Sequence, residues 1–234
     1  MKKAVILAAG RGTRMGELTR EIPKPLIPLN GRPMLLHILD RIAEAGVEEV
    51  LLVTGYLAEQ IEEVAIGHGL RVSFRRQEKV NGTAKAALLA RQWVGASPFL
   101  LTFGDILAEP EHYVGLRESF AGFDGVLAAR YVEDPYQGAA IYVDEERRVQ
   151  RIIEKPERGT STTHWNSAGI YVFSPLVFDE FARVPLSARG EYEATSAITQ
   201  MLDAGRVFKM FALEGTWMDV GRPEDLAAAA EAVA

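Results

Sequence analysis

Near its N-terminus the chain reads Leu7-Ala8-Ala9-Gly10-Arg11-Gly12-Thr13-Arg14-Met15-Gly16, directly after the apolar run that begins at Ala4. The run predicts a buried strand over Ala4–Ala8, and the glycines predict a loop that follows it. Small residues let backbone N–H groups approach a polyphosphate closely, and Arg14 adds a forked set of donors for phosphate oxygens. Ligands of open α/β sheets bind at this end of a strand. A plain strand-to-loop turn is the alternative for the loop taken alone.

The residues in and after this loop exclude two common phosphate-binding motifs and add a lysine. No glycine stands at Met15, so the dinucleotide fingerprint is broken, and no Gly-Lys-Ser/Thr forms a Walker loop. The next segment, Ile22-Pro23-Lys24-Pro25-Leu26, places a proline on each side of Lys24. Because both prolines restrict the backbone, the Lys24 ammonium should project from a fairly fixed point. A stiff surface loop is the alternative for this segment.

Short apolar runs alternate with amphipathic segments, which predicts βαβ units and a largely parallel sheet. The expected strands are Ala4–Ala8, Glu49–Thr54, Arg71–Arg75, Phe99–Phe103, Gly125–Tyr131, Gly138–Val143, Val149–Ile153, Trp165–Phe173 and Val207–Leu213. The expected helices are Pro33–Ala45, Leu57–Ile66, Thr83–Gln92, Pro175–Ala182, Glu193–Ala204 and Pro223–Ala232. No repeat, linker or low-complexity tract interrupts them, so we expect residues 1–234 to form one domain.

The composition excludes several classes of protein. Of 234 residues, 48% are hydrophobic and 25% charged, which is ordinary for a globular protein with its own core. The absence of cysteine excludes disulfides, thiolate metal sites and cysteine nucleophiles, and it fits a reducing cytoplasm. The net charge of −6 argues against a general nucleic-acid-binding protein, and no stretch approaches the roughly 18 apolar residues of a membrane span. We therefore expect a cytoplasmic protein without a nucleic-acid or membrane partner.

The loop at residues 7–15 and the segment Pro23-Lys24-Pro25-Leu26 together resemble the signature of the sugar-1-phosphate nucleotidyltransferases, which include glucose-1-phosphate thymidylyl- and uridylyltransferases. Further segments that resemble this family follow in order: Gln77 to Gly82-Thr83-Ala84, Phe103-Gly104-Asp105, Tyr136-Gln137-Gly138, Glu154-Lys155-Pro156, Asn166-Ser167-Ala168-Gly169 and Trp217-Met218-Asp219-Val220-Gly221. Each segment is weak evidence alone, but the shared order is specific. The resemblance implies a Rossmann-like three-layer α/β/α fold with a mixed, mostly parallel central sheet and a small inserted sheet, in a short form without a β-helix domain.

The same resemblance implies a reaction and a set of residues. A sugar 1-phosphate attacks the α-phosphorus of a nucleoside triphosphate, and pyrophosphate leaves. Arg14 and Lys24 are the implied catalytic groups, and Asp105 and Asp219 the implied Mg²⁺ ligands. The implied nucleotide-binding residues lie mainly in residues 1–110: Leu7, Ala8, Ala9, Gly10, Gly12, Thr13, Arg14, Gln77, Gly82 and Thr83. The implied sugar-phosphate-binding residues lie in residues 111–234: Gly138, Glu154, Lys155, Asn166 and Gly169.

Gln77 bears on the choice of base. A carboxamide offers one donor and one acceptor, which match O4 and N3–H of uracil or thymine, whereas the two adjacent donors of guanine suit a carboxylate better. The sequence therefore favours UTP or dTTP. Lys79-Val80-Asn81 lacks the proline usual in thymidylyl relatives, and Thr83 also occurs in guanylyl relatives. The sugar is not indicated, nor is the choice between a monomer and a homo-oligomer.

Three other functions compete with this hypothesis. A cytidylyl- or guanylyltransferase would act on another sugar 1-phosphate, on phosphocholine or on an inositol phosphate. A non-catalytic regulatory homologue should have lost the charged site residues, yet Arg14, Lys24, Asp105 and Asp219 are all present. A glycosyltransferase would usually show two acidic residues separated by one, whereas Gly104-Asp105-Ile106-Leu107 holds a single acid.

Overall fold

Four parallel strands form the first part of the main sheet in the computed structural model, which describes residues 1–234. In spatial order they are β5 (Arg71–Arg76), β4 (Glu49–Thr54), β1 (Lys3–Ala8) and β6 (Phe99–Phe103). From its second residue on, β1 is buried throughout, because helices cover both faces of the sheet. Alternate residues of the strand point to opposite faces, so an unbroken apolar run suits this central position.

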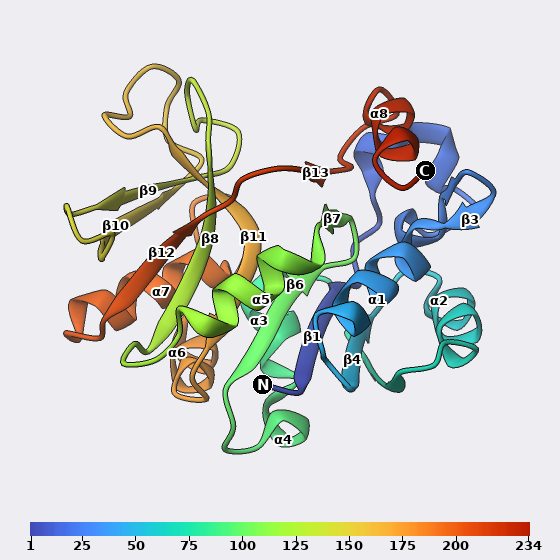
Figure 1. Cartoon of the computed structure of the whole chain (residues 1–234), viewed down its shortest axis with the longest axis horizontal. Helices are drawn as coiled ribbons and strands as arrows, with labels where there is room; N and C mark the ends of the chain where they lie inside the picture. The colour runs from blue at the N-terminus through green and yellow to red at the C-terminus, as the bar shows by residue number, and fades with distance from the viewer.

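A long antiparallel strand extends the sheet into the second half of the chain. This strand, β11 (Trp165–Phe173), pairs with β6 on one side. Beyond β11 the sheet branches, as Figure 1 shows on its left side. One branch holds β8 (Gly125–Tyr131) and β12 (Phe208–Ala212), and the other holds β9 (Ala139–Val143) and β10 (Val149–Glu154). The main sheet therefore has nine strands and is mixed.

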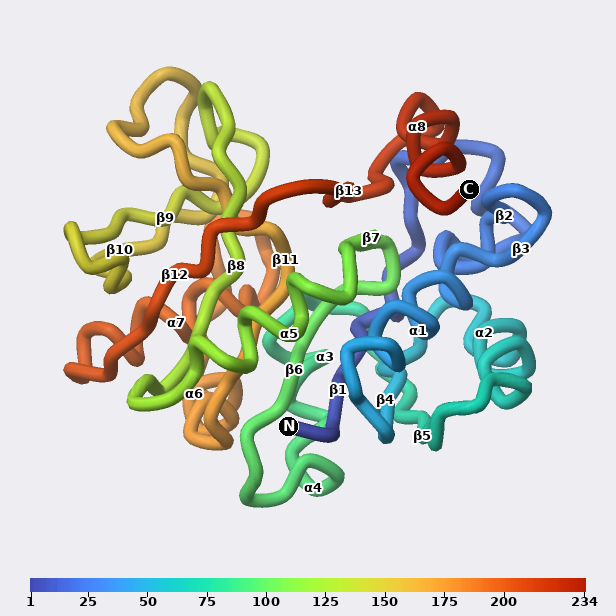
Figure 2. The backbone as a smooth tube through the Cα atoms, viewed as in Figure 1, coloured from blue at the N-terminus to red at the C-terminus, as the bar shows by residue number.

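Two small antiparallel sheets lie apart from the main sheet. The first joins β2 (Pro28–Leu29) to β3 (Arg32–Pro33), and the second joins β7 (Ile106–Ala108) to β13 (Trp217–Asp219). The trace in Figure 2 follows the chain as it leaves β12, passes through β13 beside β7 and ends in α8 on the opposite side. The second small sheet thus links the late part of the chain to the end of β6.

Helices cover both faces of the main sheet. One face packs against α3 (Thr83–Leu88), α4 (Arg91–Val94), α6 (Val177–Arg183) and α7 (Ala194–Asp203). The other face packs against α1 (Met34–Glu44), α2 (Ala58–Ile66), α5 (Pro110–Glu118) and α8 (Asp225–Glu231). In β1, Val5 and Leu7 belong to the first core and Ala4, Ile6 and Ala8 to the second. The expected three-layer α/β/α fold is confirmed. None of the helices combines the length and the apolar character that a membrane crossing needs.

The single helix expected over Thr83–Gln92 is wrong, because the structure divides it into α3 and α4. At the break, Leu89 N donates to Ala86 O and Ala90 N donates to Ala87 O, so the backbone changes to the tighter i→i−3 pattern. Two short 3₁₀ segments, Thr13–Thr19 and Lys24–Leu26, were also not predicted.

Candidate active site

The glycine-rich loop brings Lys24 beneath the end of β1. Lys24 is only 6% exposed, and its Nζ lies 2.5 Å from Oδ2 of Asp105, which follows the end of β6 after Gly104. Gly12 makes this contact possible, since it has a φ of +64° and a Cβ there would lie 2.9 Å from the Cβ of Lys24. Gly104 has a similar role, because a Cβ would lie 3.1 Å from the side chains of Ala8 and Pro25. The loop, the proline-flanked lysine and Asp105 therefore form one packed unit.

The second small sheet brings Asp219 next to Asp105. Asp219 pairs with Ile106 in the β7–β13 ladder, and Val220 N donates to the Asp105 carbonyl at 3.0 Å. Asp219 is exposed to the cleft, where partial desolvation by the surrounding atoms and then the Asp105 carboxylate raise its pKa, while Lys24 and Arg14 act in the opposite direction. The two aspartates implied as metal ligands thus lie together at the carboxyl edge of the parallel strands.

The surroundings of this pair fit a divalent cation that is shared with a ligand. The Trp217 indole donates to the Ala168 carbonyl at 2.9 Å, so Asp219 is not its acceptor. Asp225, and not Asp219, caps the following turn through the N–H groups of Gly221 and Arg222. No cluster of three or more His, Cys, Asp or Glu residues could hold a metal by itself. Two carboxylates completed by phosphate oxygens and water are, however, the usual environment of Mg²⁺.

A cleft of about 1220 Å³ extends from the two aspartates toward β9 and β10. Nine of the residues implied by the resemblance line it: Arg14, Thr83, Asp105, Gly138, Glu154, Lys155, Asn166, Gly169 and Asp219. The other implied residues are not part of its lining: Leu7, Ala8, Ala9, Gly10, Gly12, Thr13, Lys24, Gln77 and Gly82. Of these, Leu7, Ala8 and Ala9 are buried at the end of β1, and Lys24 reaches the site through Asp105.

Close backbone contacts shape the end of the cleft that lies over β9 and β11. A Cβ on Gly138 would lie 2.4 Å from Oδ1 of Asn166, and that buried oxygen has no hydrogen-bond partner. Gly169 has a φ of +70° and packs against the ring of Phe103. Lys155 is exposed, and its backbone has a φ of +43°. Its backbone N–H donates to the Gly138 carbonyl at 2.7 Å. The Asn166 oxygen is therefore a buried acceptor without a partner in the wall of this part of the cleft.

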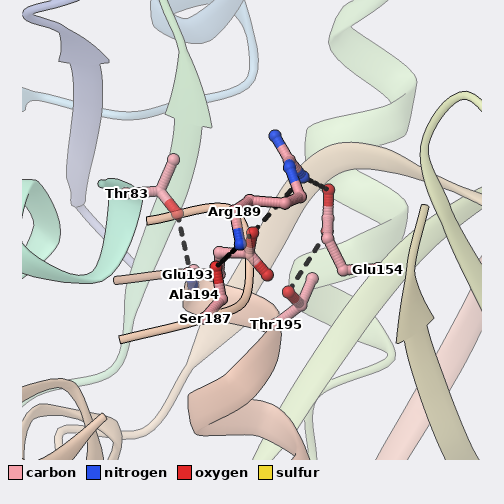
Figure 3. Close-up of polar contacts among 7 residues, drawn as sticks. All are labelled: Thr83, Glu154, Ser187, Arg189, Glu193, Ala194 and Thr195. Atoms are coloured by element: carbon pink, nitrogen blue, oxygen red, sulfur yellow. Dashed lines mark hydrogen bonds and ion pairs between the residues drawn. The ribbon is translucent and has the colours of Figure 1, made fainter. Parts of the chain in front are cut away.

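Glu154 lies at the centre of a polar network that Figure 3 shows. Its Oε1 accepts from Arg189 Nη1 at 3.2 Å, and its Oε2 accepts from Thr195 Oγ1 at 3.1 Å. Arg189 also pairs with the buried Glu193 at 3.3 Å, and Ser187 Oγ donates to the same Glu193 oxygen at 3.1 Å. Burial and then the Glu193 carboxylate raise the pKa of Glu154, which Thr195, Arg189 and Lys155 lower.

Sequence reasoning missed several side chains that line the cleft, notably Arg130, Arg189, Glu193 and Thr195. Arg130 lies opposite Asn166 in the β8–β11 ladder, and its guanidinium is 4.8 Å from the centre of the Trp217 ring. A charged residue near the end of an apolar strand was a signal for Arg130. The closely spaced charges of the segment Arg189-Gly190-Glu191-Tyr192-Glu193 were a signal for Arg189 and Glu193.

The residues implied for the base lie beside the cleft. Gln77 is 7% exposed, and its Nε2 donates to Asn81 Oδ1 and to the Gly82 carbonyl, each at 3.3 Å. Its Oε1 accepts no hydrogen bond within the protein. The carboxamide is thus held by its own loop with the oxygen available as an acceptor.

A family model described as nucleotidyl transferase matches residues 3–234. The chain belongs to the nucleotidyl transferase family. The resemblance read from the sequence is therefore confirmed, and the match includes both aspartates, the glycine-rich loop and the Glu154 network.

Two curated relatives illustrate the range of this family. The low-salt glycan biosynthesis nucleotidyltransferase Agl11 of Haloferax volcanii is 34% identical over 96% of this chain and 64% of its own length. The mannose-1-phosphate guanylyltransferase catalytic subunit beta of Xenopus tropicalis is 32% identical over 95% of this chain and 62% of its own length. The chain thus spans somewhat less than two thirds of the length of these relatives.

A solved UDP-glucose pyrophosphorylase, in complex with UDP-glucose, shares the fold over nearly its whole length. Its TM-score is 0.88, and the match covers 99% of this chain and 98% of that chain at 23% identity. The nucleotidyltransferase architecture thus accounts for the whole described chain.

Proposed function

We propose that the protein transfers a nucleotidyl group from a nucleoside triphosphate to a sugar 1-phosphate, with Mg²⁺, and releases pyrophosphate. The observation that carries this proposal is the meeting of Asp105 and Asp219 beside Lys24 and Arg14, at one end of a large cleft. Relatives named as a glycan-biosynthesis nucleotidyltransferase and a mannose-1-phosphate guanylyltransferase support it.

The chemistry requires charge neutralisation and alignment more than a protein nucleophile. A phosphate oxygen of the sugar 1-phosphate forms a bond to the α-phosphorus, and the bond from that phosphorus to the α–β bridging oxygen breaks. Arg14 and Lys24 would bind the triphosphate and oppose the charge that develops on it, and Lys155 would bind the sugar phosphate. Asp105 and Asp219 would hold Mg²⁺, which would screen the phosphate charges.

The sugar would occupy the end of the cleft that Glu154 and Asn166 line. Both side chains carry acceptor oxygens, and sugar hydroxyls are donors. Gly138 and Gly169 let the Asn166 side chain and the Phe103 ring pack directly against the backbone at this end. A hydroxyl that donates to the unpaired Asn166 Oδ1 would satisfy an otherwise unmatched buried acceptor.

UTP or dTTP is the proposed nucleotide. The available Gln77 Oε1 can accept from N3–H of uracil or thymine, as the sequence suggests. The guanylyltransferase relative makes GTP the direct competitor.

A panel of substrates tests the proposal. ATP, GTP, UTP, CTP and dTTP are each combined with glucose, mannose and N-acetylglucosamine 1-phosphates, and with phosphocholine and an inositol phosphate, and released pyrophosphate is measured. We expect turnover with a sugar 1-phosphate and with UTP or dTTP. Turnover only with phosphocholine or an inositol phosphate would replace the proposal with that alternative, and no turnover with any pair would indicate a non-catalytic homologue.

Substitution of the aspartates tests the proposed site. Asp105→Asn and Asp219→Asn should each lower kcat at least about 10²-fold, because each removes charge stabilisation at the transferring phosphate. Asp203→Asn is the matched control, since Asp203 is exposed at the end of α7 and should leave kcat unchanged. Undiminished turnover after Asp105→Asn would refute the proposed mechanism.

A further inference from the structure

Three hydrogen bonds join the start of α3 and the loop before it to the segment that begins α7. Tyr192 N donates to the Asn81 carbonyl, Ala84 N donates to the Tyr192 carbonyl, and Ala194 N donates to Thr83 Oγ1, each at 2.9 Å. The segments are more than 100 residues apart in the sequence. Two of the three bonds use backbone atoms only, so Thr83 provides the one side-chain hydrogen bond among them.

The backbones of the two segments are in direct contact. A Cβ on Gly82 would lie 2.4 Å from both N and O of Tyr192. Ala194 is only 4% exposed, so water cannot readily replace the Thr83 hydroxyl as the partner of its N–H. A shift of the Gly82–Thr83 backbone therefore has to move the start of α7.

Thr83 takes over a role that normally belongs to the residue preceding a helix. The first N–H groups of a helix lack partners within it, and the N-cap side chain commonly satisfies one of them. The N-cap of α7 is Glu193, and its side chain makes no capping hydrogen bond. Thr83 satisfies the N–H of Ala194, the first residue of α7, while the Glu193 carboxylate contacts Arg189 and Ser187 in the cleft.

The start of α7 also sets the position of Glu154. Thr195, the residue after Ala194, donates its hydroxyl to Glu154 Oε2, and Arg189 connects Glu154 to Glu193. Figure 3 shows the connection from Thr83 through Ala194 to the two glutamates. The residues on either side of Ala194 therefore both reach into the part of the cleft proposed for the sugar phosphate.

We propose that Thr83 is a positioning residue that couples the nucleotide site to the sugar-phosphate site. A nucleoside triphosphate that orders the Gln77–Thr83 loop fixes Ala194 through the Thr83 hydroxyl, and thereby places Glu193, Arg189 and Glu154 for the sugar phosphate. This inference rests on the proposed function, since it names the regulation of the same site. Linkage requires reciprocity, so the sugar phosphate must strengthen nucleotide binding by the same factor.

Equilibrium binding measures the coupling directly. The probes are α,β-imido-UTP and glucose 1-phosphate, replaced by the corresponding analogue and sugar phosphate if another pair turns over fastest in the panel. Isothermal titration gives the Kd of the sugar phosphate with and without the saturating analogue. We expect the analogue to lower this Kd at least about fivefold in the wild type, the lower end of the range typical of coupled sites.

Substitution of Thr83 separates coupling from direct contact. Thr83→Val should reduce the ratio of the two Kd values to below about twofold, whereas Thr83→Ser should retain it. Thr199→Val is the matched control, because Thr199 lies on α7, donates only to the Thr195 carbonyl and is not part of the cleft lining. A direct nucleotide contact alone would weaken analogue binding in Thr83→Val but leave the ratio unchanged, and that result would overturn the proposal.

Hydrogen exchange provides a readout that requires neither turnover nor the correct sugar. The probe is the nucleoside triphosphate that raises the melting temperature most, added with Mg²⁺ and without sugar phosphate. It should slow exchange over residues 191–195 in the wild type and in Thr195→Val, but not in Thr83→Val. Thr195→Val breaks only the contact with Glu154, so it should lose the coupling ratio while it keeps this protection.

Failure of the inference differs from failure of the proposed function. Turnover in the panel with a wild-type Kd ratio near one would overturn the coupling and leave the proposed function intact. Absence of turnover, with nucleotide protection of residues 191–195 that depends on Thr83, would overturn the proposed function instead. If Thr83→Val does not fold, a wild-type ratio below twofold or a ratio unaffected by Thr195→Val still contradicts the inference.

Discussion

At the residue scale, the site depends on four charged side chains that lie near one another. The Lys24 ammonium is almost fully buried, and a buried charge is tolerated when a partner of opposite sign accompanies it. Asp105 is that partner, and Arg14 and Asp219 lie beside the pair. The local charge is therefore balanced before substrates arrive, so a divalent cation that enters with an anionic triphosphate would offset part of the charge of the triphosphate.

Gly12 should be the least replaceable residue of the glycine-rich loop. Gly12→Ala forces an L-residue into a φ of +64° and places its Cβ 2.9 Å from Lys24 Cβ, so we expect the free energy of unfolding to fall by about 1–3 kcal/mol. Urea denaturation measures the change. Gly10→Ala is the control, because a Cβ there meets nothing within 4 Å and should change stability by less than about 0.5 kcal/mol. Equal effects of the two substitutions would contradict this account of the loop.

Glu154 should reduce stability as the pH rises. Burial and Glu193 raise its pKa in the folded state above the usual unfolded value of about 4.3. The folded protein therefore binds the proton of the Glu154 carboxyl more tightly than the unfolded chain does. The stability that results is fully present below the unfolded pKa and is lost as the pH rises through the folded pKa. Glu154→Gln removes the charge, so its melting temperature should exceed that of the wild type at pH 8, and the difference should shrink toward pH 4.

A second substitution controls for general charge effects at the cleft. Glu191→Gln removes an exposed carboxylate from the same part of the cleft lining. If Glu191→Gln reproduced the pH-dependent gain of Glu154→Gln, burial of Glu154 would not be its cause. The stabilised Glu154→Gln variant should nevertheless lose activity, since Glu154 is proposed to accept from the sugar, and such a trade-off is common at binding sites.

At the scale of elements, four strands of the main sheet could be predicted from the sequence to the residue. The predicted bounds of Glu49–Thr54, Phe99–Phe103, Gly125–Tyr131 and Trp165–Phe173 are those of the structure. A strand that is buried on both faces of the sheet needs mostly apolar residues, so the local sequence pattern indicates where such a strand begins and ends. By contrast, β7 and β13 have three residues each and no local signal, because each strand exists only through pairing with the other.

The candidate site was predictable to a similar extent and for the same reason. The family resemblance indicated Asp105, Lys24 and Glu154, and the structure places them at the candidate site, while their roles stay predictions. Arg189 and Thr195 were missed, because their contacts with Glu154 depend on how α7 packs against β10 and are not apparent from nearby residues. Gln77 was predicted to bind the base, and this stays a prediction, since the cleft lining does not include it.

The β13 strand should transmit changes at Trp217 to Asp219. Trp217→Phe keeps an aromatic ring but removes the hydrogen bond to the Ala168 carbonyl and weakens the contact with Arg130. We expect kcat to fall about 10- to 100-fold, because a small displacement of a positioning group can have effects of this size. Trp93→Phe, a half-buried indole on α4, is the control and should leave kcat unchanged. A fall in thermal stability without a change in kcat would show that Trp217 does not position Asp219.

At the scale of the whole molecule, the two halves of the chain share one sheet and both hydrophobic cores. The β6–β11 ladder joins the parallel part of the sheet to the branched part. The first core contains Val5 and Leu51 together with Phe173 and Ile198, and the second core likewise draws on both halves. A half that unfolded alone would expose apolar surface on both faces of the strands that remained, which disfavours partly unfolded states.

We therefore propose that residues 1–234 unfold as one cooperative domain. Calorimetry should show a single transition whose calorimetric and van't Hoff enthalpies agree, near roughly 160 kcal/mol at about 0.7 kcal/mol per residue. Far-UV circular dichroism and tryptophan fluorescence should give the same midpoint, because Trp93 and Trp217 report on opposite halves of the chain. Two separate midpoints, or a van't Hoff enthalpy near half the calorimetric value, would show that the shared sheet does not couple the halves. In that case the nucleotide-binding and sugar-phosphate-binding parts would have to be treated as separate domains.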